Sequence, residues 1–186
     1  MSTTPLPLML RSLLLSFMAS QYEDLHGQAA REGWDHERFL RLLCERELQH
    51  RAEKRTIRLI REAHLPEGKT LASLDQDRLP ARVRRQLASL LEGGFVDRAE
   101  NVLAFGLPGR GKTHLCCAVA QELILTQGRR AYFTPAVNLV QHLLVAKRDL
   151  RLEAALRKLD AFDLIVLDDI GYIQQSREEM EVLFAF

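Results

Sequence analysis

The sequence has little of what stabilises small secreted proteins or carries a chain into a membrane. Its 186 residues include only three cysteines, which are Cys44, Cys116 and Cys117. An odd number with two members adjacent argues against a disulfide framework, and no cysteine and histidine spacing is typical of a zinc site. The apolar stretch 6–19 is interrupted by Pro7 and Arg11 and is shorter than the ~20 residues that cross a bilayer. We therefore expect a cytoplasmic protein without membrane contact.

The sequence also lacks an excess of charge of either sign, because it contains 26 basic and 25 acidic residues. Two stretches are nevertheless locally basic. They contain Arg38, Arg41, Arg46, Arg51, Lys54, Arg55, Arg58 and Arg61 in the first, and Arg78, Arg82, Arg84 and Arg85 in the second. Such clusters favour contacts with the phosphates of double-stranded DNA, without sequence preference. Acid–base pairs at helical i,i+4 spacing, such as Glu47 with Arg51, instead favour a solvated helix face, so both interpretations stay open.

The first part of the chain is typical of helices. Apolar residues at mixed three and four spacing predict helices over 8–26 and 36–64, with Asp35 as the cap of the second. The middle of that second helix has few apolar residues, which is typical of an arm that meets a partner. Pro66 and Gly68 then interrupt the pattern, and Pro80 opens a short helix that Gly93 and Gly94 end. We expect a helical partner-binding domain at 1–64, a linker at 65–80 and a second domain at 81–186.

The second domain alternates short apolar runs with helical patterns, which predicts a parallel α/β sheet flanked by helices. The expected elements are strands at 101–105, 129–134 and 164–168, and helices at 112–127, 135–148 and 150–159, followed by a last helix from 176. Thr134 is expected to cap the helix that Pro135 opens. Ser176 and Glu179 form a capping-box pattern, after which Met180, Leu183 and Phe184 would face inward.

The motif that points to chemistry is an eight-residue phosphate loop between the first strand and the following helix. It consists of Gly106, Leu107, Pro108, Gly109, Arg110, Gly111, Lys112 and Thr113. Glycines let successive backbone N–H groups turn toward phosphate oxygens, and the positive end of the helix adds to the field. Lys112 would contact the β- and γ-phosphates, and Thr113 would offer its hydroxyl to Mg²⁺. The pattern (a Walker A motif) predicts the binding of a nucleotide together with Mg²⁺.

Two acids end the apolar run LIVLDD, and the first of them lies 55 residues beyond the last residue of the loop. Asp168 is expected at the carboxyl end of the strand at 164–168, where open α/β sheets bind ligands and where a carboxylate would help to hold Mg²⁺. Asp169 is the candidate for orienting or deprotonating the attacking water. Three nearby features have simpler interpretations. His114 would point at neighbouring strands, Cys116 and Cys117 would be small buried helix residues, and Trp34 would be a packing anchor.

These residues together resemble the IstB-like ATP-binding proteins, which are helper ATPases of insertion-sequence transposition. They belong to the AAA+ class of P-loop proteins and are related to the DnaC-type helicase loaders. The resemblance covers nearly the whole chain, from MASQYEDL, GWDHERFLRLLCERELQHR and KTLASLD to ENVLAFGLPGRGKTHLCCAVA, GRRAYFT and DLIVLDDIGYIQQSREEMEVLF. It implies ATP and Mg²⁺ at Gly106–Thr113 and Asp168, catalytic roles for Lys112 and Asp169, and an N-terminal region for protein contacts.

The resemblance further implies ATP-dependent self-association on DNA together with a transposase. Asp169 stands where many AAA+ proteins have glutamate. Proteins of this type continue with a sensor strand and an arginine that acts on a neighbouring subunit, so we expect a truncated chain with an incomplete sheet and slow ATP turnover. The alternatives are a DnaC-like loader that binds a replicative helicase, and a truncated remnant that binds nucleotide without catalysis.

Overall fold

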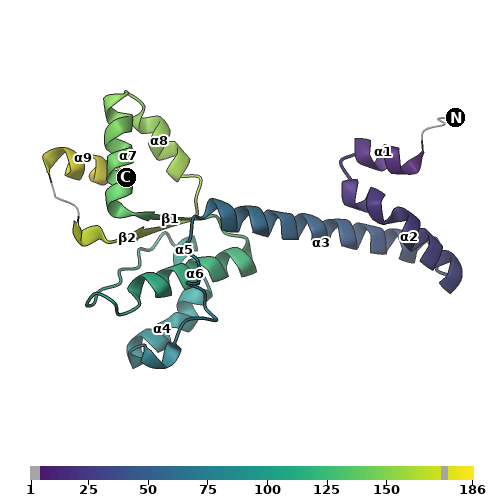
Figure 1. Ribbon diagram of the computed structural model, residues 1–186, viewed down its shortest axis with the longest axis horizontal. Helices are drawn as coiled ribbons and strands as arrows, with labels where there is room; N and C mark the ends of the chain where they lie inside the picture. The colour runs from purple at the N-terminus through teal and green to yellow at the C-terminus, as the bar shows by residue number, and fades with distance from the viewer. Residues whose placement is uncertain (1–4, 173–175) are drawn as a thin grey trace. The chain divides into compact units, whose positions relative to one another are not determined.

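The chain folds into two compact units, Met1–Arg55 and Thr56–Phe186. The computed structural model in Figure 1 describes residues 5–172 and 176–186. The boundary between the two units lies before the linker expected at 65–80. The reason is that Leu59 and Ala63, at the end of the expected first domain, pack into the core of the second unit with Ile124 and Val166. Among the described residues, no helix is both long enough and apolar enough to cross a membrane.

The first unit consists of α1 (Leu6–Ser12), α2 (Ser16–Glu32) and the first part of α3 (His36–Glu62). The single helix predicted over 8–26 is wrong, because the chain turns between α1 and α2 with Leu14 at a positive φ of 60°. The predicted cap of α3 is confirmed: the Arg38 backbone N–H donates to Asp35 Oδ1 over 2.7 Å. Trp34 packs against the core of this unit, as expected of a packing anchor. That core is built on Met18, Leu25 and Leu43.

Glu47 of α3 is buried and provides the cap that α2 otherwise lacks. Glu47 is only 6% exposed. Its Oε2 accepts a hydrogen bond from the Met18 backbone N–H over 2.8 Å. Arg51 donates to Glu47 Oε1 over 2.7 Å and to the Leu14 carbonyl over 2.6 Å, so one ion pair holds the turn between α1 and α2. Burial raises the pKa of Glu47, but the hydrogen bonds from Met18 and Arg51 outweigh it and lower the pKa overall.

The second unit is built on a parallel pair of strands with helices on both faces, as the sequence pattern predicted. Strand β1 (Ala131–Pro135) pairs with β2 (Leu164–Asp168) in a register that sets Ala131 beside Leu164 and Pro135 beside Asp168. Figure 1 shows α6 below this pair and α7, α8 and α9 above it. The helices and turns of this unit are α4 (Ala81–Leu91), α5 (Gly94–Asp97), α6 (Lys112–Gln127), α7 (Ala136–Arg148), α8 (Leu152–Leu159), α9 (Arg177–Ala185), η1 (Gln76–Arg78) and η2 (Ile170–Tyr172).

Three expectations for this unit are wrong. Residues 101–105 do not form a strand, because no described segment pairs with them, and Phe105 is 87% exposed. Thr134 does not cap α7, since its hydroxyl donates to the Pro135 carbonyl within β1. The Ser176 capping box and the inward position of Leu183 are confirmed, and Val182 is buried beside it. Met180 and Phe184 do not face inward, since they are 40% and 91% exposed.

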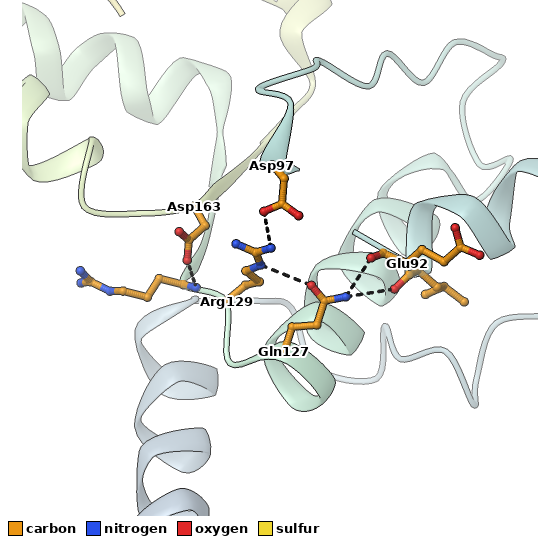
Figure 2. A network of polar contacts seen from close by, with 7 residues as sticks. Glu92, Asp97, Gln127, Arg129 and Asp163 are labelled. Atoms are coloured by element: carbon orange, nitrogen blue, oxygen red, sulfur yellow. Dashed lines mark hydrogen bonds and ion pairs between the residues drawn. The ribbon is translucent and has the colours of Figure 1, made fainter. Parts of the chain in front are cut away.

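A polar network ties the end of α6 to α4 and α5 (Figure 2). Gln127 Nε2 donates to the Glu92 carbonyl over 3.1 Å, and Arg129 pairs with Asp97 over 2.5 Å. Gly93 lies beside this network with a φ of +74°, and a Cβ there would come within 2.9 Å of Cδ2 of the fully buried Leu123. Glycine is therefore required at this position on two grounds, backbone conformation and space.

We predict that Glu47→Gln lowers the free energy of unfolding of the first unit by about 1–3 kcal/mol, because it weakens charge-assisted hydrogen bonds in a buried site. The folded-state pKa of Glu47 is below its ordinary value of 4.5. Its contribution is therefore present above that value and is lost as the pH falls through the folded-state pKa. Urea unfolding followed by the emission of Trp34, the only tryptophan, measures the change.

Glu53→Gln is the matched control, since Glu53 is an exposed residue of the same helix. An equal loss of stability in both variants, or an unchanged pH dependence in Glu47→Gln, would contradict the role given to the buried carboxylate.

Candidate functional site

The phosphate loop lies directly before α6 and is open to solvent. Residues 101–111 are all exposed. Gly109 and Gly111 have φ values of +73° and +82°, a left-handed backbone that disfavours other residues. No described residue accepts a hydrogen bond from the loop N–H groups between Gly106 and Gly111. The loop therefore presents uncommitted donors, which are the kind of group that holds an anion in a phosphate loop.

The Lys112 side chain bonds back to the loop that precedes it. Its Nζ donates to the Gly106 carbonyl over 2.9 Å and to the Leu107 carbonyl over 3.1 Å. The ammonium is thus held beside the loop donors by the loop's own backbone. A phosphate bound there would meet the charge and the N–H groups together.

Thr113 and Asp168 meet across 55 positions of sequence. The Thr113 hydroxyl lies 2.8 Å from Asp168 Oδ1 and 3.0 Å from Oδ2, and shares its proton between them. The first turn of α6 supplies the hydroxyl and the last residue of β2 supplies the carboxylate. Both are hard oxygen ligands of the kind that Mg²⁺ takes together with phosphate oxygens. Among the described residues no three His, Cys, Asp or Glu side chains come together, so a cation here would depend on this pair and on the nucleotide.

Asp169 is placed differently from its neighbour. It lies just beyond β2, is exposed and has a φ of +57°. Its carboxylate makes no hydrogen bond or ion pair with any other described residue. The positive φ occurs where the chain leaves β2 and enters η2. The structure therefore brings Thr113 and Asp168 together, and the role of Asp169 stays a prediction.

His114 was expected to point at neighbouring strands, and that expectation is wrong. Its Nε2 lies 3.0 Å from the Thr70 carbonyl and 3.1 Å from Ser73 Oγ. Because a carbonyl can only accept, Nε2 must carry the proton. The Ser73 hydroxyl in turn donates to the Gly68 carbonyl over 2.5 Å. His114 therefore fixes a compact turn at residues 68–73 beside the first turn of α6.

The stretch expected as a linker is packed rather than free. Leu74 and Leu79 are 8% and 9% exposed, and Leu71 and Leu74 join the core that contains Ala118 and Val119 of α6. Sequence reasoning missed this wall of the site. The available signal was the spacing of Leu71, Leu74 and Leu79 directly before a helix. A pattern of three leucines is too short to predict packing by itself.

The cysteines beside the site are unsuited to nucleophilic chemistry. Burial raises the pKa of Cys116, and the nearby Asp168 carboxylate raises it further. Burial raises the pKa of Cys117 to about 11. Both thiols are therefore protonated near neutral pH, which agrees with their interpretation as packing residues. Cys117 is buried as expected, whereas Cys116 is only half-buried.

Comparison with known proteins fits the geometry of the loop and the paired strands. Over residues 8–186 the sequence matches the family described as IstB-like ATP binding protein. The chain belongs to this family. The resemblance of its motifs to IstB-like proteins is thereby confirmed.

Three relatives have names that describe insertion-sequence ATP-binding proteins. The relative from Sinorhizobium fredii is 43% identical over 180 residues, which cover 96% of this chain and 60% of that protein. The relative from Pseudomonas aeruginosa is 34% identical over 96% of this chain and 67% of its own length. The relative from Geobacillus stearothermophilus is 31% identical over 92% and 68%. This IstB-like chain thus spans about three fifths to two thirds of the length of these relatives.

We predict that His114→Ala loosens the turn at residues 68–73. The variant removes the donor to the Thr70 carbonyl and the contact with Ser73, which together are worth about 1–3 kcal/mol. Amide hydrogen exchange in a peptide covering this turn should become about tenfold faster or more. His142→Ala, which changes an exposed histidine of α7, is the control. Unchanged exchange in His114→Ala would show that the leucines alone hold the segment.

Proposed function

We propose that this chain binds ATP with Mg²⁺ at Gly106–Thr113 and Asp168, as a helper ATPase of DNA transposition. The single observation that supports this most strongly is the Thr113 and Asp168 contact, because it joins the end of the phosphate loop to the end of a buried strand. Open α/β sheets bind ligands at that edge. The relatives named as insertion-sequence proteins support the biological setting.

Each residue of the loop has a role that its position supports. The N–H groups of Gly106, Leu107, Gly109, Arg110 and Gly111 would hold phosphate oxygens, while Pro108 lacks an N–H and shapes the turn. Lys112 would contribute a point charge at the terminal phosphates. Thr113 and Asp168 would hold the metal ion, whose charge neutralises the phosphates. Asp169 would orient or deprotonate the attacking water, since its carboxylate is exposed and uncommitted.

We further propose that double-stranded DNA binds through arginines of α4. Arg82, Arg84 and Arg85 lie within the first five residues of this helix, whose first turn contains no acid. Cations are unfavourable at a helix N-terminus, so the cluster costs stability unless an anion covers it. Arg84 lies 3.5 Å from the exposed Asp77, a weak pairing. Self-association on DNA and partnership with a transposase complete the proposed role.

We predict that Lys112→Ala weakens ATP binding about 100-fold or more, since the triphosphate would face only backbone dipoles and the metal ion. A titration with a fluorescent ATP analogue in the presence of Mg²⁺ measures the affinity. Lys158→Ala, which removes an exposed lysine of α8, is the control for net charge. Equal affinity of Lys112→Ala and the parent chain would refute the nucleotide site.

We predict that DNA affinity falls steeply with salt and does not depend on DNA sequence. The double variant Arg82→Ala with Arg85→Ala should reduce the slope of log affinity against log salt by about two, one for each lost phosphate contact. Fluorescence anisotropy with a labelled duplex measures this slope. The control removes Arg157 and Lys158 of α8 by the same substitutions. A strong preference for one DNA sequence, or an unchanged slope in the α4 variant, would contradict the proposal.

A further inference from the structure

The first unit contains a cavity of about 410 Å³ that is separate from the nucleotide site. It lies between the end of α2 and the first half of α3. Trp34 and Leu42 form its apolar part, and both also pack against the core of the unit. Its charged part is formed by Glu32, Arg38, Arg41, Glu45 and Arg46.

Two contacts orient the Trp34 ring at this cavity. Its indole Nε1 donates to Glu32 Oε2 over 2.8 Å, and the Arg38 guanidinium stacks over its ring at 4.5 Å. Gln28 donates to the other oxygen of Glu32 over 2.9 Å. The hydrogen bonds from Gln28 and Trp34 lower the pKa of Glu32, so it stays ionised and keeps the indole in place. An aromatic surface fixed in this way loses little entropy on binding.

The arginines at this cavity are only partly committed. No described residue accepts a hydrogen bond from the Arg38 guanidinium, although the ring below fixes its plane. Arg41 pairs with Glu37, but both side chains are well exposed, at 66% and 80%, so the pair is weak. Arg46 donates to the Gln21 side chain over 3.0 Å. Planar guanidinium groups with spare donors match the two oxygens of a carboxylate.

We propose that this cavity binds an acidic peptide segment of a partner protein, with a carboxylate on Arg38 and Arg41 and an apolar side chain against Trp34 and Leu42. Tryptophan and arginine are the side chains most enriched where protein interfaces gain their energy. DNA fits less well, because Glu32 and Glu45 stand in the wall and would repel a continuous phosphate backbone. This inference does not depend on nucleotide binding by the second unit.

The test uses the full chain and the emission of Trp34, its only tryptophan. A short acetylated peptide of glutamate and leucine is titrated, beside a peptide with lysine in place of each glutamate and beside a short DNA duplex. We expect a saturable change in emission with the glutamate peptide alone. Equal responses to both peptides, or a response to the duplex without one to the glutamate peptide, would overturn the proposal.

Charge reversal separates recognition from loss of folding. The double variant Arg38→Glu with Arg41→Glu should bind the glutamate peptide at least about tenfold more weakly and should now bind the lysine peptide, a gain that an unfolded variant would not show. Lys54→Glu is the control, because it changes the charge of α3 away from the cavity. Unchanged peptide preference in the double variant, or an equal change in Lys54→Glu, would also overturn the proposal.

Discussion

The parallel pairing of β1 with β2 sets the position of the chemical groups in the second unit. Backbone hydrogen bonds between the strands place Pro135 and Asp168 at the same edge, where both strands end. The pairing also extends past the start of the strands, because the Asp163 carboxylate accepts the Arg130 backbone N–H over 2.7 Å. A shift of register by one residue would turn the Asp168 side chain to the other face, away from Thr113. The metal-binding pair that we propose therefore depends on strand register more than on the phosphate loop itself.

Helix α6 connects the packed core of the second unit to the phosphate loop, which directly precedes it. Five residues along it, Cys117, Ala118, Ala120, Leu123 and Ile124, are essentially without exposed surface. Some of them pack toward the strands and others toward α4 and the segment at residues 71–79, so the helix is enclosed on more than one side. A helix apolar on several sides belongs in an interior, and its first turn is consequently a firm base for Lys112 and Thr113.

The elements that the sequence predicted well are those whose signals are local. Gly111 precedes α6 and Gly128 ends it, both with positive φ, and Ser176 caps α9 with its own side chain. Two of the failures, at residues 101–105 and at His114, concern distant partners. The apolar run at 101–105 has strand composition, but a strand forms only where another backbone satisfies its N–H and C=O groups, and none of the described segments does so. His114 likewise found its partners more than 40 positions away, and no periodicity predicts such a contact.

The groups at the phosphate site are already bonded within the protein, and this determines where any affinity for nucleotide arises. Lys112 would exchange two loop carbonyls for phosphate oxygens, and Thr113 would exchange Asp168 for a metal ion. Such exchanges contribute little net free energy when the bonds are similar in kind, since one hydrogen bond replaces another. The gain comes instead from charge, because a carbonyl dipole attracts the ammonium less than a phosphate does. The free energy of binding also comes from the loop N–H groups, because these would exchange only hydrogen bonds to water for bonds to phosphate. Affinity at this site should therefore depend on the charge of the phosphates far more than on the number of hydrogen bonds they accept.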